Sequence, residues 1–444
     1  MGVIIGVLLL LVVLTVFGLT HWYLWRRLVR DVAAPGGLWR RAGTVLAVLL
    51  PLLALGAVLG GRALPLAAER WVAWPGFLWL AVLLYLTLAL LVGEAVRPLL
   101  NRVPSPRRRM RPGPAATGGS GGAREYTEPA APATPTEPAA PATPTEPAAP
   151  AAPAGPTEAA PAAGFAAPRS PERRLFVARA VAIGAGGAAA AVVGNGMYGV
   201  LRGPKVKQVT VPLAKLPARA HGYRIAVVSD IHLGPILGRA HTQRIVDTIN
   251  AARPDLVTIV GDLVDGTVPE LGPAAEPLAR LRARDGSFFV TGNHEYFSGA
   301  APWVDFVRSL GVHPLRNERV ELAGFDLAGV NDLAGTSEGD GPDFEKALGD
   351  RDRTRTSVLL SHQPVTIHDA VRHGVDLQLS GHTHGGQLWP GNYLAALANP
   401  TVAGLERYGD TQLYVTRGAG AWGPPVRVGA PSDITIVTLA SPHA

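Results

Sequence analysis

The chain of 444 residues contains no cysteine, which excludes disulfide bonds and any metal site built from thiolate ligands. This absence fits an exported domain without disulfides, and it fits a cytoplasmic domain equally well. Charged residues make up only 17% of the chain, and four long stretches contain none of them. These stretches are Gly2 to Trp25, Ala42 to Gly61, Trp71 to Gly93 and Ala180 to Leu201.

Each uncharged stretch is close to the roughly 20 residues that cross a bilayer as a helix. The first three are rich in Leu, Val and Trp and predict transmembrane spans. The fourth is mostly Ala and Gly, so it is either a fourth span, a loosely packed helix or a signal-like segment that is not retained. The segment from Ser170 to Phe176 before it resembles a twin-arginine export signal, although a plain basic flank explains it as well.

Arginines gather on one side of the predicted spans. One group lies between the first two spans and another follows the third, whereas the loop from Arg62 to Arg70 has only its two terminal arginines. The groups are Arg26, Arg27, Arg30, Arg40 and Arg41, and then Arg97, Arg102, Arg107, Arg108, Arg109 and Arg111. Because arginine-rich segments stay in the cytoplasm, the N-terminus is expected outside, and a retained fourth span carries the C-terminal domain outside. Basic residues after the fourth span, at Arg202, Lys205 and Lys207, leave a cytoplasmic domain as the alternative.

Residues 104–168 are built from Pro, Ala, Thr and Glu and contain a nine-residue repeat, TEPAAPATP, that starts at Thr127 and again at Thr136. Such a segment has almost nothing large and apolar to bury, so we predict a disordered, partly polyproline II linker. A plain tether and a Pro-rich recognition segment are both consistent with it. The net charge of +7 does not predict nucleic-acid binding, because much of the arginine excess lies beside the spans.

Five short polar motifs each follow an apolar, strand-like run in the C-terminal half of the chain. The runs are 224–228, 256–260, 287–290, 357–360 and 375–379, and the motifs are Asp230-Ile231-His232, Gly261-Asp262, Gly292-Asn293-His294-Glu295, Ser361-His362 and Gly381-His382-Thr383-His384. Any one motif alone is typical of an ordinary turn. Ligands bind at the carboxyl ends of the strands in layered α/β sheets, so the five motifs are expected to meet on one rim.

Apart from Glu295, the motifs together supply two carboxylates, one carboxamide and five imidazoles. These donors suit Mn, Fe, Zn or Co, and the sequence does not say which. Two such ions about 3.5–4 Å apart can clamp the attacking and leaving oxygens of an in-line displacement and lower the pKa of a bridging water. The residue types therefore favour a two-metal centre with an additional acid.

The order DxH, GDxxD, GNHE, a lone His and GHTH closely resembles the calcineurin-like metallophosphoesterase superfamily. The sequences SHQP at Ser361 to Pro364 and GHTHGGQ at Gly381 to Gln387 look like its membrane-anchored bacterial branch. The resemblance covers roughly Val206 to the C-terminus and implies a four-layer α/β/β/α sandwich. Helices predicted at 242–252, 274–284, 302–310 and 366–373, and late strands at 412–415 and 433–439, agree with it.

The resemblance also implies roles for individual residues. One metal would be held by Asp230, His232 and His384, and the second by Asn293, His362 and His382. Asp262 would bridge both ions.

Three further side chains of these motifs would not bind metal. His294 would face the substrate and protonate the leaving oxygen or stabilise the phosphoryl charge. Asp265 is better placed as a partner of a ligand or a loop anchor, and Glu295 is consistent with a simple loop carboxylate.

The predicted organisation is a transmembrane region at 1–103, a linker at 104–168, a fourth span or twin-arginine-like segment at 169–204 and a metallophosphoesterase domain at 205–444. We expect a multi-pass cell-membrane enzyme with its catalytic domain outside the cytoplasm. The expected substrate is a phosphoester or pyrophosphate, favoured on a lipid or envelope precursor. Apolar residues after the GHTH motif, from Leu388 to Leu397, form either a lip that touches lipid or part of the core.

Two other functions remain open at this point. One is a phosphodiesterase or nucleotide phosphatase that acts on a soluble substrate. The other is a non-catalytic membrane scaffold or receptor that keeps the fold. The expected partners are the bilayer and the substrate, with neither nucleic acid nor an obligate protein partner.

Overall fold

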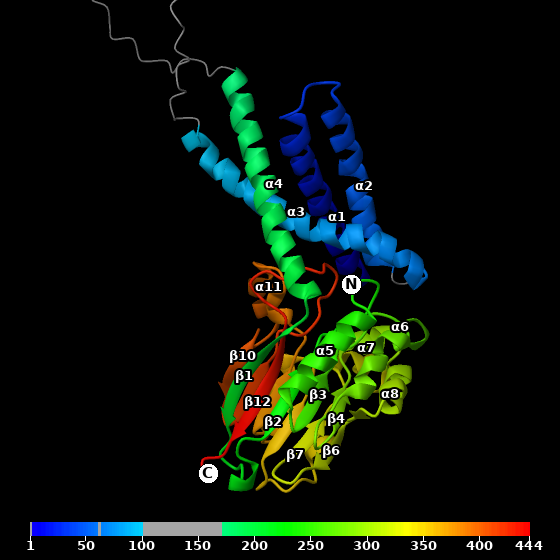
Figure 1. Ribbon diagram of the computed structural model, residues 1–444, viewed down its shortest axis with the longest axis vertical. Coiled ribbons are helices and arrows are strands. Elements are labelled where there is room, and N and C mark those ends of the chain that lie inside the picture. Colours follow the sequence, from blue (N-terminus) through cyan, green and yellow to red (C-terminus); the bar gives the residue numbers. More distant parts are fainter. Residues whose placement is uncertain (1, 61–63, 101–170) are drawn as a thin grey trace, which may run out of the picture.

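A computed structural model of the protein describes residues 2–60, 64–100 and 171–444. The predicted linker at 104–168 lies outside the described residues. Four long helices stand at one end of the molecule, and a domain of two β-sheets flanked by shorter helices stands at the other (Figure 1).

The four long helices are α1 (Gly2–Trp25), α2 (Leu38–Gly60), α3 (Leu66–Leu100) and α4 (Pro171–Leu201). All four are long enough and apolar enough to cross a membrane. Outward-facing side chains of α1 and α2 are apolar and exposed, among them Leu9 at 61% and Val48 at 60%, a surface suited to lipid chains. The fourth stretch forms a helix packed on α3, where its small residues Ala185 and Ala189 meet Leu90 in one buried cluster.

The loop after α1 lies at the end of the helices far from the C-terminal domain (Figure 1). Arg27 pairs with Glu94 near the end of α3 at 3.1 Å, and Arg179 in the early part of α4 donates to the carbonyl oxygen of Val32 at 3.1 Å. The described parts of the segments predicted to face the cytoplasm therefore share one end of the helical region. The N-terminus and the C-terminal domain share the other end (Figure 1).

The C-terminal domain contains two six-stranded sheets. The first has the order β1-β12-β2-β3-β4-β5, formed by Lys205–Pro212, Asp433–Ala440, Arg224–Val228, Leu256–Val260, Ser287–Val290 and His313–Pro314. The second has the order β10-β11-β9-β8-β7-β6, formed by Gly404–Tyr408, Thr411–Val415, Leu377–Ser380, Ser357–Leu360, Asp326–Gly329 and Glu318–Glu321. Strands β2, β3 and β4 run parallel, as do β7, β8, β9 and β11.

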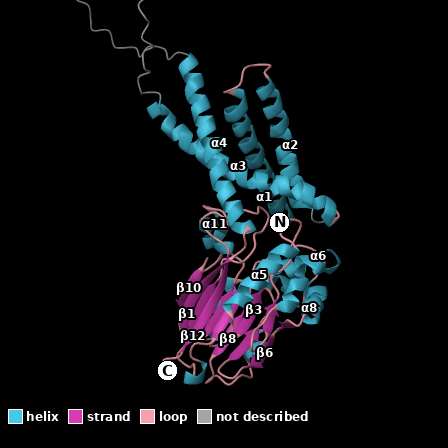
Figure 2. Cartoon of the chain, viewed as in Figure 1, coloured by secondary structure: helices cyan, strands magenta, loops and turns pink. Residues whose placement is uncertain are grey.

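Helices cover the outer face of each sheet, and those on the first sheet can be seen in Figure 2. The first sheet is covered by α5 (Arg239–Ala252), α6 (Val268–Ala275) and α8 (Ala300–Ser309), with Ile245 and Trp303 in the buried layer between. The second is covered by α9 (Phe344–Leu348) and α10 (Ile367–Arg372). A third core, which includes Val227, Leu360 and Tyr414, fills the space between the sheets. The predicted four-layer α/β/β/α sandwich is thereby confirmed.

Most predicted elements form with small changes at their ends. The strands β2, β3, β4 and β8 have the predicted bounds. The helix predicted at 274–284 is wrong, because α6 ends at Ala275 and only a short 3₁₀ segment, Glu276–Arg280, follows it. Pro277 lacks the backbone N–H that a continuing helix needs.

Candidate metal centre

Strands β2, β3, β8 and β9 and the short helix α7 (Asn293–Ser298), which follows β4, bring the polar motifs to one edge of the sandwich. Several of the candidate ligands have a left-handed backbone, with φ of 52° at Asp230, 53° at Asp262 and 71° at His382. His232 and His384 share this conformation, with φ of 49° and 53°. Residues other than glycine rarely adopt this left-handed backbone conformation, and such backbone strain is concentrated at functional sites.

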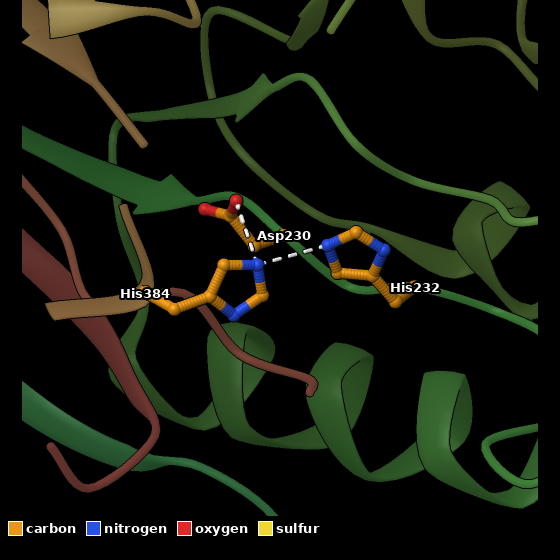
Figure 3. A group of neighbouring side chains, drawn as sticks. All are labelled: Asp230, His232 and His384. Atoms are coloured by element: carbon orange, nitrogen blue, oxygen red, sulfur yellow. Dashed lines mark hydrogen bonds and ion pairs between the residues drawn. The ribbon is translucent and has the colours of Figure 1, made fainter. Parts of the chain in front are cut away.

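The first group of candidate ligands is Asp230, His232 and His384 (Figure 3). The Nε2 atoms of the two histidines lie 3.0 Å apart, and His384 Nε2 lies 3.4 Å from Asp230 Oδ1. All three side chains are buried. They therefore present two ring nitrogens and one carboxylate oxygen to a common point.

The second group is Asp262, His362 and His382. His362 Nε2 lies 3.0 Å from Asp262 Oδ2, and His382 Nδ1 lies 3.0 Å from Asn293 Oδ1. Asp262 Oδ2 is also 3.8 Å from His232 Nε2, so this carboxylate faces both groups. The structure thus brings all seven predicted ligand residues together.

Gly292 allows the loop after β4 to lie close to Asp262 in the loop after β3. A Cβ atom at this position would lie 2.3 Å from Asp262 Oδ1, far inside van der Waals contact. The backbone N–H of His294 donates to the same oxygen at 2.9 Å. The glycine of the GNHE motif is therefore required for the position of Asp262.

His294 lies beside the ligand groups, with its side chain partly exposed. Its Nδ1 is 2.7 Å from Asp265 Oδ1, and the same oxygen is 2.8 Å from His232 Nδ1. A single oxygen of Asp265 therefore orients both the candidate ligand His232 and the candidate acid His294. His294 is also close enough to His232 and Asp262 to offer a ligand atom of its own.

Electrostatics favour cations in this cluster. Burial would raise the pKa of Asp265, but the two histidines it contacts lower it to about 2. Burial would also raise the pKa of Asp262, but His362 above all holds it far below its usual range. Burial would lower the pKa of His232, but nearby carboxylates, first that of Asp265, raise it to about 9. The cluster thus keeps two buried carboxylates ionised at neutral pH.

Two observations show that metal ions fit this donor set. His362 Nε2 is buried without a hydrogen bond of acceptable geometry, although its other nitrogen, Nδ1, lies 2.8 Å from the carbonyl oxygen of Val260. Burial raises the pKa of Asp230 in spite of the opposing effect of His362, so this carboxylate has too little positive charge around it. Carboxylate, carboxamide and imidazole donors at such spacing suit divalent ions of the Mn, Fe, Zn or Co type.

Glu295 has a larger structural role than the sequence indicates. Its buried carboxylate accepts the backbone N–H groups of Asp262 at 3.0 Å, Leu263 at 2.8 Å and Gly292 at 2.6 Å. Burial, followed by the negative charge of Asp262, raises its pKa to about 7. Glu295 therefore ties the loop after β3 to the start of α7, and a Glu three residues after the residue that precedes a helix is the sequence signal that could have revealed it.

Arg427 supports the GHTH loop and was not predicted from the sequence. This buried guanidinium donates to the carbonyl oxygens of His384 at 3.0 Å and Gly420 at 2.7 Å, and its Nη2 lies 3.0 Å from His384 Nδ1. No motif surrounds Arg427 in the sequence, so only the fold reveals its role.

Two cavities open from the cluster, and both reach the membrane helices. The first, of about 660 Å³, is lined by Asp262, Asn293 and His382 of the cluster and by Leu84 of α3. The second, of about 990 Å³, is lined by His232 and His294 of the cluster and by Phe77 of α3. His294, Phe297 and Trp422 line both cavities.

The C-terminal domain contacts the membrane helices directly beside the cluster. Tyr85 of α3 donates its hydroxyl to the carbonyl oxygen of Trp389 at 2.9 Å, and Val426 is buried among residues of α3 and α4. Helix α11 (Gly391–Ala398) lies next to this contact and buries none of its residues. Leu394 is 71% exposed and Leu397 is 84% exposed, so the alternative that α11 belongs to the core is wrong.

Comparison with known proteins agrees with the geometry. A family model of calcineurin-like phosphoesterases matches residues 223–386. The chain is 41% identical over 258 residues to a transmembrane protein with metallophosphoesterase domain from Danio rerio, and 40% identical over 248 residues to an uncharacterized metallophosphoesterase from Helicobacter pylori. These matches cover 55% of this chain in each case, and 59% and 66% of the respective relatives.

A third relative is matched over most of its length. It is an uncharacterized metallophosphoesterase from Aquifex aeolicus, 35% identical over 240 residues, which cover 53% of this chain and 91% of that protein. The two sheets, the convergent motifs and this match lead to one conclusion. The chain belongs to the family of calcineurin-like metallophosphoesterases.

Proposed function

We propose that this protein is a membrane-bound phosphoesterase that uses two divalent metal ions and hydrolyses a phosphoester or pyrophosphate bond of a lipid or cell-envelope precursor. The observation that carries the proposal is a cavity lined both by residues of the ligand cluster and by Leu84 of the apolar helix α3. A substrate that reaches the cluster by this route approaches along the membrane surface.

The proposed ligands of one ion are Asp230, His232 and His384. Those of the other are Asn293, His362 and His382, with Asp262 shared by both. The distances between the donor atoms of the two groups support this division. When bound, two such ions activate a water molecule and neutralise the charge of the phosphoryl group.

His294 is proposed to donate a proton to the leaving oxygen or to stabilise the phosphoryl charge. Its partly exposed ring faces the junction of the two cavities, and Asp265 fixes its orientation through Nδ1. The rings of Phe297 and Trp422 lie 5.5 and 5.7 Å from its own ring and narrow the access of water to it. The chain itself therefore supplies an oriented acid beside the proposed metal site.

A lipid substrate is supported by the apolar side of the first cavity. Leu84 of α3 and Leu388 and Leu394 beside or within α11 line it. Burial of an aliphatic chain against such side chains stabilises a complex by about 0.8 kcal/mol for each CH₂ group removed from water. The exposed lip of α11 continues this apolar surface toward the membrane helices.

The catalytic domain is proposed to lie outside the cytoplasm. The arginine-rich segments at the opposite end of the helices support this orientation under the positive-inside rule. Two reporter fusions test it, one near Ala160 and one after His443, each with alkaline phosphatase and with a fluorescent protein that matures in the cytoplasm. We expect phosphatase activity at the C-terminal fusion and fluorescence at the Ala160 fusion, and fluorescence at the C-terminal fusion contradicts the orientation.

The activity is tested with the full chain in detergent micelles loaded with Mn²⁺. Hydrolysis of p-nitrophenyl phosphate or its bis ester distinguishes an enzyme from a scaffold. A lipid phosphoester compared with a short-chain analogue then distinguishes a lipid substrate from a soluble one. Leu394→Asp should lower kcat/KM for the lipid roughly tenfold and leave that for the short-chain analogue similar, whereas Val371→Asp, on the exposed face of α10, serves as the control.

A further inference from the structure

The cavity beside His232 and His294 contains a buried carboxylate without a partner. Glu69, in the first turn of α3, is only 9% exposed and lines this cavity. Among the described residues its carboxylate has neither a hydrogen bond nor an ion pair. A carboxylate that lines a cavity without a cationic partner attracts a cation that enters the cavity, and the low exposure of the side chain strengthens this attraction.

The other acidic groups of the cavity already have partners. Glu270 accepts the backbone N–H and the hydroxyl of Thr267 at 3.2 and 2.7 Å, and Asp265 is bound to His232 and His294. No Lys or Arg is among the described residues that line the cavity. The cavity therefore carries negative charge that the described part of the chain does not balance.

Aromatic rings complete the walls of this cavity. Phe77 of α3, Phe297 of α7 and Trp422 all line it, and Phe297 and Trp422 are 63% and 59% exposed. The faces of aromatic rings attract organic cations, and the attraction grows when the cation leaves water. A carboxylate and aromatic rings that line one cavity are the chemistry that recognises an ammonium group.

On the basis of the function proposed above, we infer that the substrate carries an ammonium group, primary or quaternary, that enters this cavity and pairs with Glu69. The phosphoryl group would then lie at the junction of the two cavities, beside His294. The apolar part of the substrate would occupy the cavity between α3 and α11. The substrate class is thus an amine-bearing phosphoester at the membrane surface.

The test uses two p-nitrophenyl diesters of the same shape, one with a cationic head group and the other with a neutral one. One is p-nitrophenyl phosphorylcholine, and the other is p-nitrophenyl 3,3-dimethylbutyl phosphate, in which carbon replaces the quaternary nitrogen. The full chain in detergent micelles with Mn²⁺ is expected to prefer the choline ester roughly tenfold in kcat/KM, the usual scale of one charged contact. An ethanolamine ester serves as a third substrate and reports whether a primary amine is preferred.

Glu69→Gln keeps the shape of the side chain and removes its charge, so the ratio of the two kcat/KM values should fall to about one. Glu94 lies on the same helix outside the cavity, so the control variant Glu94→Gln should keep the ratio of the unaltered protein.

If neither diester is turned over, inhibition of p-nitrophenyl phosphate hydrolysis by phosphocholine and by 3,3-dimethylbutyl phosphate measures the same preference. A ratio of about one in the unaltered protein, or an unchanged ratio in Glu69→Gln, overturns this inference while the proposed function stands. Failure to hydrolyse any of the p-nitrophenyl esters overturns the proposed function, and the inference falls with it.

Discussion

Replacement of Asp265 by Asn tests the link between the ligand cluster and the proposed acid. The Oδ1 atom of Asp265 contacts His232 Nδ1 at 2.8 Å and His294 Nδ1 at 2.7 Å. Asn keeps an oxygen that can accept both bonds, so the substitution removes mainly the negative charge. The variant therefore measures what the charge contributes rather than what the contact contributes.

The expected magnitude follows from the pKa of Asp265. The two histidines lower this pKa from 3.8 to about 2, and each pKa unit corresponds to about 1.4 kcal/mol, so the charge stabilises the metal-free fold by about 2 kcal/mol at pH 7. Because the folded pKa is depressed, this stabilisation is present above pH 4 and is lost as the pH falls toward 2. In a domain of this size, about 2 kcal/mol corresponds to a decrease in Tm of roughly 4–8 °C.

Thermal unfolding of the metal-free chain in detergent, followed by tryptophan fluorescence, measures this difference. Asp305→Asn is the matched control, because Asp305 is exposed and pairs only with Arg308. The Asp265→Asn variant should also bind Mn²⁺ about 10- to 100-fold more weakly, since partners of metal-ligating histidines orient the ring. An unchanged Tm at pH 7, or a difference that grows as the pH falls below 4, refutes the assignment.

Two further predictions concern other histidines. His294→Ala should retain its metal content and lose about 10²- to 10⁴-fold in kcat, with a smaller loss for substrates that have good leaving groups, and loss of metal would make His294 a ligand instead. Neither ring nitrogen of the buried His241 on α5 has a hydrogen bond of acceptable geometry with the described residues, and burial, followed by Arg244 and Arg427, lowers its pKa to about 4. Because this histidine must stay neutral in the folded protein, it lowers the free energy of unfolding increasingly as the pH falls from 6.5 to 4. His241→Leu should therefore lose about 3 kcal/mol less stability than the unaltered protein at pH 4, as measured by urea titration at each pH. An equal loss of stability in both proteins contradicts the argument.

Much of the fold could be predicted because its signals are local. Runs such as Leu256 to Val260 are rich in β-branched residues and end at a polar motif. The run predicts the strand, and its end predicts the edge of the sheet at which the motif lies. The apolar stretches of the four long helices are long enough to cross the hydrocarbon core of a bilayer. The convergence of the motifs then follows from the parallel arrangement of the strands that carry them.

The contacts that complete the site depend on residues far apart in the sequence. Tyr85 and Trp389 meet across 304 positions, and this contact joins the cavities to the membrane helices. Arg427 reaches His384 from a loop without any recognisable motif. Glu69 stands at the start of an apolar helix, where a carboxylate is typical of the end of a span, so its burial beside the cluster becomes visible only in the fold.

The central proposal is a pair of metal ions that share Asp262 and drive phosphoester hydrolysis. The most direct measurement is the metal content of the purified full chain and of its Asp262→Ala variant, determined together with p-nitrophenyl phosphate hydrolysis in Mn²⁺. We expect two ions for each unaltered chain, and a variant that has lost both metal and activity because both ions lose a common ligand. An Asp262→Ala protein that binds two ions and turns over substrate at the original rate contradicts the proposed site.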